Sequence, residues 1–138
     1  MPLTYEQAER ALEAAVAKAV EMSIAVAIAV VDDKGGPVAL ARMNGARYFT
    51  GEVAIGKAKA SALFGNPSGR MAQNIPPAIA GAVTEITGGR AIFWQGAVPI
   101  KSAGELVGAI GASGSTSEND EVVSQAGADA VLAAAASA

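Results

Sequence analysis

A glycine-spaced stretch, Gly-x-x-Gly-x-x-Gly, occupies residues 108–114, and a Ser-x-x-Asp pair follows at Ser117 and Asp120. The apolar residues around the first glycines favour a buried strand, and Ser117-x-x-Asp120 is typical of a helix N-terminus. Backbone N–H groups at such a turn, together with the positive end of a helix, attract an anion or a carbonyl oxygen. Alternatively, the glycines only permit close packing of a helix on a sheet. The first interpretation predicts an oxyanion site lined by Gly111, Ser113 and Gly114.

Two kinds of cation are candidates for the same site. Val38, Leu40 and Arg42 alternate along a predicted strand, so their side chains lie on the same face of it. The guanidinium of Arg42 would therefore emerge from an otherwise apolar face. A planar guanidinium suits a carboxylate, and the alternative is an arginine that snorkels at the sheet edge. Lys57 and Lys59 point to different sides of a predicted helix, so one of them can face inward. Lys57 would line the site, or it would only keep the surface soluble.

Histidine and cysteine are both absent from the sequence. Ser-His-Asp and Cys-His triads, imidazole-ligated metals and disulfides are therefore excluded, and no metal site is expected. Proton transfer would fall to carboxylates, lysine, tyrosine or water, and our candidates are Lys57, Glu52 and Glu85. Arg42 would hold a carboxylate, and we add Asn44 and Pro99 to the ligand-binding set. Isomerisation, hydration or elimination on a small oxo-acid is the chemistry that best suits these groups.

The composition restricts the class of protein. The 138 residues fit a single domain, spanning 1–138, and no apolar run is long enough to cross a bilayer. The net charge of −3 is spread without basic clusters, which argues against nucleic acid as a partner. Hydrophobic residues make up 51% and many are alanine, so we expect a homo-oligomer with an apolar interface. The N-terminus has no signal-peptide pattern, and we expect a cytoplasmic protein.

The first third of the chain predicts a helix and a hairpin. Thr4 begins a capping box, and apolar residues at helical spacing predict a helix over about 4–22. Residues 24–31 are apolar at every position. The even-numbered side chains are bulky, and the odd-numbered ones are mostly alanine. This pattern indicates a central strand whose alanine side allows an element or a ligand to come close. The turn residues 32–37 then return the chain as a second strand over 38–43.

The middle third is predicted to be largely helical. A helix over about 50–64 would begin with Thr50 as its N-cap. Gly56 in its interior indicates a close neighbour, either another subunit or a bound molecule. A short helix is expected over 68–74, and residues 78–89 suit a lid or an interface loop.

The last third supplies the remaining strands. Residues 90–95 are predicted to form a strand, 98–101 a short edge strand because of Pro99, and the glycine stretch a further one. A final helix follows over about 117–136. The order of elements therefore predicts an α+β fold with a five-stranded, mostly antiparallel sheet flanked by helices.

Several short motifs follow one another along the chain: Ala29-Val-Val-Asp32 with Gly35, Ala41-Arg-Met-Asn-Gly-Ala46, Ala54-x-x-Lys-Ala58, Val98-Pro-Ile100, and Gly104-Glu-Leu-Val-Gly-Ala-Ile-Gly-Ala-Ser-Gly114 with Asp120 and Ala126-Gly127. Together they resemble the GlcG/HbpS family, whose domain also forms the C-terminus of PduO-type corrinoid adenosyltransferases. The resemblance covers nearly the whole chain. It implies a profilin-like fold, assembly into dimers or higher oligomers, and haem binding or degradation in some members, with small-molecule roles in others.

The chain departs from this family pattern at two places. Asn44 stands where the family often has aspartate, and Gly96-Ala97 where it often has two glycines. Without histidine, the soft or phenolate groups that remain for haem iron are those of Met43, Met71, Tyr5 and Tyr48.

Three functional hypotheses follow. The first is a small-molecule site, with or without catalysis, and the second is a haem-binding or haem-degrading protein. The third is an oligomeric scaffold or regulatory domain without chemistry.

Overall fold

The computed structural model describes residues 2–137, so the two terminal residues of the predicted domain lie outside it. Within this range the sheet has four antiparallel strands in the order β2-β1-β4-β3. The strands are β1 (Ala27–Asp32), β2 (Pro37–Arg42), β3 (Ala97–Ser102) and β4 (Glu105–Ser113).

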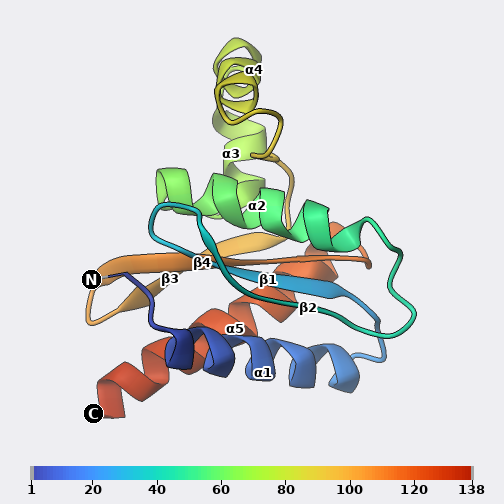
Figure 1. Cartoon of the computed structure of the whole chain (residues 1–138), viewed down its shortest axis with the longest axis vertical. Helices are drawn as coiled ribbons and strands as arrows, with labels where there is room; N and C mark the ends of the chain where they lie inside the picture. The colour runs from blue at the N-terminus through green and yellow to red at the C-terminus, as the bar shows by residue number, and fades with distance from the viewer. Residues whose placement is uncertain (1, 138) are drawn as a thin grey trace.

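Helices cover both faces of the sheet. They are α1 (Tyr5–Glu21), α2 (Thr50–Phe64), α3 (Ser68–Asn74), α4 (Pro77–Ile86) and α5 (Ser117–Ser137). Figure 1 shows α1 and α5 on one face and α2 on the other, with α3 and α4 extending away from α2. The α+β prediction is confirmed. No helix in the described range is both long enough and apolar enough to span a bilayer.

The two faces of β1 differ as their parity predicts. Val26, Ile28 and Val30 belong to the main core, which also contains buried alanines of α1 and valines of α5. On the opposite face Ala27 and Ala29 pack against Ala54 of α2. Small side chains on both surfaces bring the axis of α2 close to the sheet. The alanine face of β1 therefore packs against α2.

Gly111 of β4 lies directly beneath α2. A Cβ atom added at this position would lie 2.5 Å from the carbonyl oxygen of Ala54 and 3.0 Å from the amide nitrogen of Ala58. The backbone of α2 therefore fills the space above Gly111 on this face of the sheet. The glycine serves close helix packing, which was the alternative explanation.

The predicted strand over residues 90–95 is not present, which explains why the sheet has four strands instead of five. Gly88 and Gly89 have φ values of +67° and +78°, and they turn the chain across α2. The backbone N–H of Ile92 donates to the carbonyl oxygen of Gly56 at 3.0 Å. A Cβ on Gly56 would lie 2.5 Å from Cδ1 of Ile92. The close neighbour of Gly56 is therefore this segment, and not a subunit or a ligand.

Several helix boundaries also differ from prediction. Thr50 lies inside α2, where its hydroxyl donates to the carbonyl oxygen of Arg47 at 2.6 Å, and Phe49 is the N-cap. At α5 the hydroxyl of Thr116 accepts from the N–H of Asn119 at 3.1 Å, one residue before the predicted cap. Residues 77–86 form α4 instead of a loop, beginning with a proline in the first turn, where proline is favoured.

We expect Gly111→Ala to lower the free energy of unfolding by about 1–3 kcal/mol, because the added methyl group must push α2 off the sheet. Urea unfolding followed by circular dichroism measures the difference. The matched control is Gly81→Ala in α4, where no atom lies within 4 Å of the added Cβ. The control should be stabilising by up to about 1 kcal/mol, as alanine favours helix. Equal stabilities for the two variants would contradict this account of Gly111.

Candidate functional site

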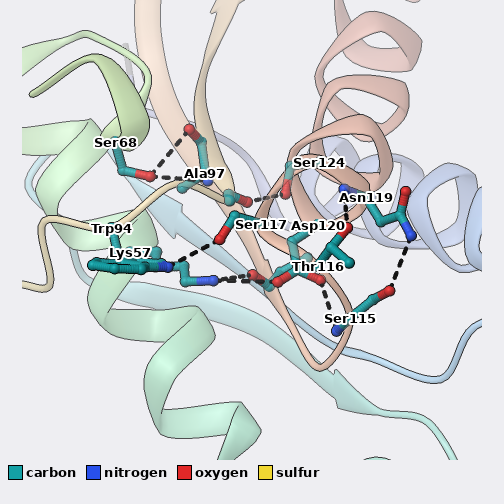
Figure 2. A network of polar contacts seen from close by, with 12 residues as sticks. Lys57, Ser68, Trp94, Ala97, Ser115, Thr116, Ser117, Asn119, Asp120 and Ser124 are labelled. Atoms are coloured by element: carbon teal, nitrogen blue, oxygen red, sulfur yellow. Dashed lines mark hydrogen bonds and ion pairs between the residues drawn. The ribbon is translucent and has the colours of Figure 1, made fainter. Parts of the chain in front are cut away.

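The side chain of Lys57 extends from α2 to the first turn of α5, past the end of β4. Its Nζ atom lies 3.3 Å from Oδ2 of Asp120 and donates to the carbonyl oxygen of Ala112 at 3.1 Å. Figure 2 shows the ammonium and the carboxylate facing each other. Lys57 is 3% exposed and Asp120 is 2% exposed. The two residues form an ion pair that is almost completely removed from bulk water.

The carboxylate of Asp120 is held by the turn that leads into α5. Its Oδ1 atom accepts a hydrogen bond from the backbone N–H of Ser115 at 3.0 Å. The N–H of Asp120 donates in turn to the carbonyl oxygen of Thr116 at 2.9 Å. A carboxylate in the first turn of a helix also interacts favourably with the positive end of the helix dipole. Local chain geometry therefore fixes Asp120 before any ligand is present.

Burial changes the protonation equilibria of both partners. Desolvation raises the pKa of Asp120, although the charge of Lys57 and the hydrogen bond from Ser115 act in the opposite direction. Desolvation likewise lowers the pKa of Lys57 against the effect of Asp120. The two pKa values are thus shifted toward each other, which suits a pair that exchanges a proton.

Gly96 makes room for the lysine. A Cβ on Gly96 would lie 2.7 Å from Nζ of Lys57 and 2.8 Å from the carbonyl oxygen of Ala112, and its φ of +144° disfavours other residues. The carbonyl oxygen of Gly96 accepts from the N–H of Ala112 at 3.0 Å and from the hydroxyl of Ser124 at 2.7 Å. This bend in the chain therefore connects β4, α5 and the ion pair.

A cavity of about 320 Å³ lies over the ion pair, and we call it the lysine cavity. Its polar lining is formed by Lys57, Asp120, Ser113, Ser115 and Ser117. Its apolar lining is formed by Phe49, Val53, Ile92, Phe93 and Trp94. Small-molecule sites commonly combine such apolar walls with a few converging polar groups, in volumes of about 300–1,000 Å³.

Trp94 lies beside the serines of the lysine cavity. Its indole N–H donates to the hydroxyl of Ser117 at 2.9 Å, as Figure 2 shows, while 61% of the residue is exposed. The indole thus contacts both the cavity and solvent. Trp94 was not among the predicted site residues, because its segment was assigned to a strand.

A second depression adjoins the lysine cavity, and we call it the apolar hollow. Its volume is about 480 Å³, and it shares Phe49, Val53 and Ile92 with the lysine cavity. Its charged lining residues are Glu52, Lys59 and Arg90. The ammonium of Lys59 donates to the carbonyl oxygen of Gly35 at 2.7 Å.

The structure brings some of the predicted site residues together. Lys57 and Ser113 line the lysine cavity, and Glu52 lines the apolar hollow next to it. Asp120 was predicted as part of a helix start and as one of the motif residues, yet it is also the direct partner of Lys57. Neither its capping pattern nor its place in the motif reveals that its side chain is buried.

The other predicted site residues lie elsewhere. Arg42 and Asn44 are exposed at the end of β2 and in the following loop, and neither lines the lysine cavity or the apolar hollow. The reason is that β2 is an edge strand, separated from β4 by β1. Glu85 is exposed on α4, which stands away from the sheet. The remaining three residues are Gly111 under α2, Gly114 in the turn after β4, and Pro99 on the edge strand β3.

The described residues contain no group of three or more aspartate, glutamate, histidine or cysteine side chains arranged to hold a metal ion. Met71 is buried in a small core cluster, and Met43 packs against the main core. Tyr48 is exposed, and the hydroxyl of Tyr5 donates to Glu9 on α1. None of these four side chains lines the lysine cavity or the apolar hollow.

Lys57→Met should destabilise the protein by about 3–5 kcal/mol at neutral pH, because it leaves the Asp120 carboxylate buried without a cation. The pKa of Asp120 already lies above the ordinary value and rises further without Lys57. Between the ordinary pKa of an aspartate and the raised pKa of Asp120, the folded variant binds more protons than the unfolded chain. The free energy of unfolding of the variant therefore falls as the pH rises through this range. Urea unfolding at about pH 5 and about pH 8 tests this, as the loss should be larger at the higher pH.

A matched control adds Asp120→Asn to Lys57→Met, which removes the unpaired charge. The double variant should recover part of the lost stability and should lose the extra pH dependence. If Lys57→Met alone were equally destabilised at both pH values, Asp120 would not be the buried partner that the geometry indicates.

Comparison with known proteins gives consistent results. A relative from Citrobacter freundii, an uncharacterized 15.0 kDa protein of the dhaT-dhaS intergenic region, is 25% identical over 128 residues, which is 92% of this chain and 90% of the relative. The crystal structure of a double mutant of Streptomyces reticuli HbpS is 31% identical, with a TM-score of 0.83 over 94% of this chain and 86% of that one. A PduOC:haem complex shares the fold at 22% identity, with a TM-score of 0.82 over 94% and 95% of the two chains. The family described as haem-degrading protein HbpS-like matches residues 3–129, and the chain belongs to this family.

Proposed function

We propose that the protein binds a small oxo-acid, or a closely related small carbonyl compound, in the lysine cavity. The observation that carries the proposal is the buried ammonium of Lys57 in the wall of that cavity. An ammonium has three N–H donors, and the contacts to Asp120 and Ala112 account for two of them. The third would donate to a ligand oxygen in a partly desolvated space, where such a bond is strong.

The surroundings of Lys57 support a polar ligand. The hydroxyls of Ser113, Ser115 and Ser117 supply neutral donors and acceptors around the ammonium. Phe49 and Val53 supply part of the apolar lining. Lys57 thus takes the anchoring role first assigned to Arg42, whose side chain does not line this cavity.

Such a site also suits proton transfer next to a carbonyl group. A carbonyl oxygen bonded to Lys57 would carry the negative charge that develops when a neighbouring carbon loses a proton. Asp120 would accept or return that proton, in place of the predicted bases Glu52 and Glu85, because it contacts Lys57 directly. Isomerisation, hydration and elimination all use this step.

Trp94 is the single tryptophan of the chain and lines the lysine cavity, so its fluorescence reports binding there. Titration with pyruvate or glyoxylate should produce a saturable change in emission. Lys57→Met should abolish the change, because the ligand loses its charged donor. Arg42→Ala is the matched control and should keep it. A Lys57→Met variant that binds these acids as well as the wild type would place the ligand elsewhere.

Haem is the second candidate ligand, and three observations favour it. The family is described as haem-degrading, and a structural neighbour is a haem complex. The apolar hollow also combines apolar walls with Lys59 and Arg90, which would pair with haem propionates. Its lining includes no histidine, tyrosine or methionine. The hollow thus offers apolar contacts for the ring and cations for its propionates, but no strong axial ligand for the iron.

Haemin titration tests this second candidate. Binding in the apolar hollow would give a Soret band that saturates at one haem per chain, and a double variant, Lys59→Ala with Arg90→Ala, would weaken it. Arg10→Ala on α1, in the opposite layer, is the matched control and should have no effect. If no saturable Soret change occurs at micromolar haemin, haem is not the ligand of this hollow.

We also propose that the chain forms a homo-oligomer through α4. This helix has no buried residue, and its Ile79 and Ile86 are 51% and 83% exposed. An apolar helix that stands away from its own sheet is typical of a surface covered by another subunit. If no small molecule or haem binds, the oligomeric scaffold without chemistry becomes the better hypothesis.

Sedimentation equilibrium should give the mass of a dimer or a larger assembly. Replacing Ile79 and Ile86 together with glutamate should shift the protein to smaller species, because burying the new charges is unfavourable. Val20→Glu, at an exposed position of α1, is the control and should leave the mass unchanged. Dissociation by the control alone would place the interface on α1.

A further inference from the structure

We propose that Lys57 captures a small aldehyde or ketone covalently, as a Schiff base, and that Asp120 moves the proton that this reaction requires. The inference deepens the proposed function and rests on it, because the lysine cavity must first admit the carbonyl compound. It assigns Lys57 the role of nucleophile in addition to that of hydrogen-bond donor.

The position of Nζ supports a nucleophilic lysine. Lys57 lines a cavity of about 320 Å³, and its Nζ atom lies 3.3 Å from Oδ2 of Asp120. Ammonium groups are poor nucleophiles, and a lysine in a desolvated pocket is the usual arrangement that releases a neutral amine. Burial lowers the pKa of Lys57, which acts in this direction. The contact with Asp120 provides a place for the released proton.

Other lysines of the described chain lack this combination. Lys34 and Lys101 are exposed, and Lys18 pairs with Glu21 on the surface of α1. Lys59, two residues from Lys57, donates to the carbonyl oxygen of Gly35 and lines the apolar hollow instead. Geometry therefore singles out Lys57 and makes Lys59 its natural control.

The reaction balances without an external reagent. Lys57 gives a proton to Asp120, its nitrogen attacks the carbonyl carbon, and the oxygen takes that proton as the C=O π bond becomes a C–O single bond. Asp120 then removes one proton from the new C–N nitrogen and returns it to the hydroxyl group, which leaves as water. The products are a protonated Schiff base, a carboxylate and one water molecule.

The charge pattern of the site is the same before and after this reaction. A protonated Schiff base carries one positive charge on the same nitrogen and keeps one N–H for Asp120. No buried charge is left without a partner, which would otherwise cost several kcal/mol. The covalent product therefore keeps the ion pair with Asp120 and gives up the hydrogen bond from Nζ to the carbonyl oxygen of Ala112.

Reductive trapping tests the inference. Wild-type protein is incubated with glyoxylate and sodium cyanoborohydride, and peptide mapping by mass spectrometry locates the reduced adduct. We expect labelling at Lys57 to exceed that at the exposed Lys34 and Lys101. Glycolate, which has no aldehyde or ketone group and cannot form a Schiff base, should protect Lys57 and leave the exposed lysines unprotected. Asp120→Asn should slow labelling of Lys57 by about 100-fold, the usual effect of losing a general acid–base group.

Two variants provide the matched comparison. Lys57→Arg keeps a positive charge but cannot form the Schiff base, so the protected adduct should disappear. Lys59→Arg should retain it. If Lys57→Arg does not fold, as judged by circular dichroism, the site mapping and glycolate protection in the wild type decide the question alone.

Failure of this inference is distinguishable from failure of the proposed function. A saturable change in Trp94 fluorescence with glyoxylate, but without an adduct at Lys57, would overturn Schiff-base formation and leave non-covalent binding intact. Absence of both signals would overturn both. Labelling that only follows the exposure of each lysine would likewise overturn the inference.

Discussion

The close approach of α2 to the sheet is the constraint on which the candidate site depends. On the face that packs against α2, the sheet carries small residues at Ala27, Ala29, Ala109 and Gly111. At this short separation the lysine stem reaches over the end of β4 to the start of α5. A larger residue at any of these positions would raise the helix and separate the ammonium from its carboxylate. Packing and electrostatics are therefore parts of one arrangement.

The ion pair is stable only because its surroundings compensate for lost water. Two charges in a protein interior repay their desolvation when additional hydrogen bonds satisfy their remaining donors and acceptors. Here the carbonyl oxygen of Ala112 and the N–H of Ser115 supply those bonds. Both groups belong to the backbone at the end of β4 and the turn after it, which explains why this turn is so closely defined around the site.

Local patterns predicted a large part of the fold. The capping box of Thr4 and Gln7 forms as expected, and the alternating parity of the central strand separates a bulky face from an alanine face. Residues 90–95 were assigned to a strand because their composition suits one, but tertiary contact with Gly56 holds this segment across α2. Composition alone does not contain that contact, since its two partners are far apart in sequence.

The site was less predictable than the fold for a related reason. Helical spacing indicates that one of Lys57 and Lys59 turns inward, as Lys57 does. The spacing of residues does not indicate which strands become neighbours. Arg42 was placed in the site for its chemistry, yet strand order puts it at an edge. Asp120 was interpreted as part of a helix start, and its burial depends on a helix 63 residues earlier.

Lys57 and Asp120 are separated by 63 residues in the sequence, so their contact forms through long-range folding. The loop between them must close before the pair exists, and closing a long loop carries an entropic cost that local helix formation does not. The contact between the two residues therefore depends on the long-range docking of α5 and not on local helix formation. A chain synthesised only as far as β4 lacks Asp120, so Lys57 has no carboxylate partner until α5 is made.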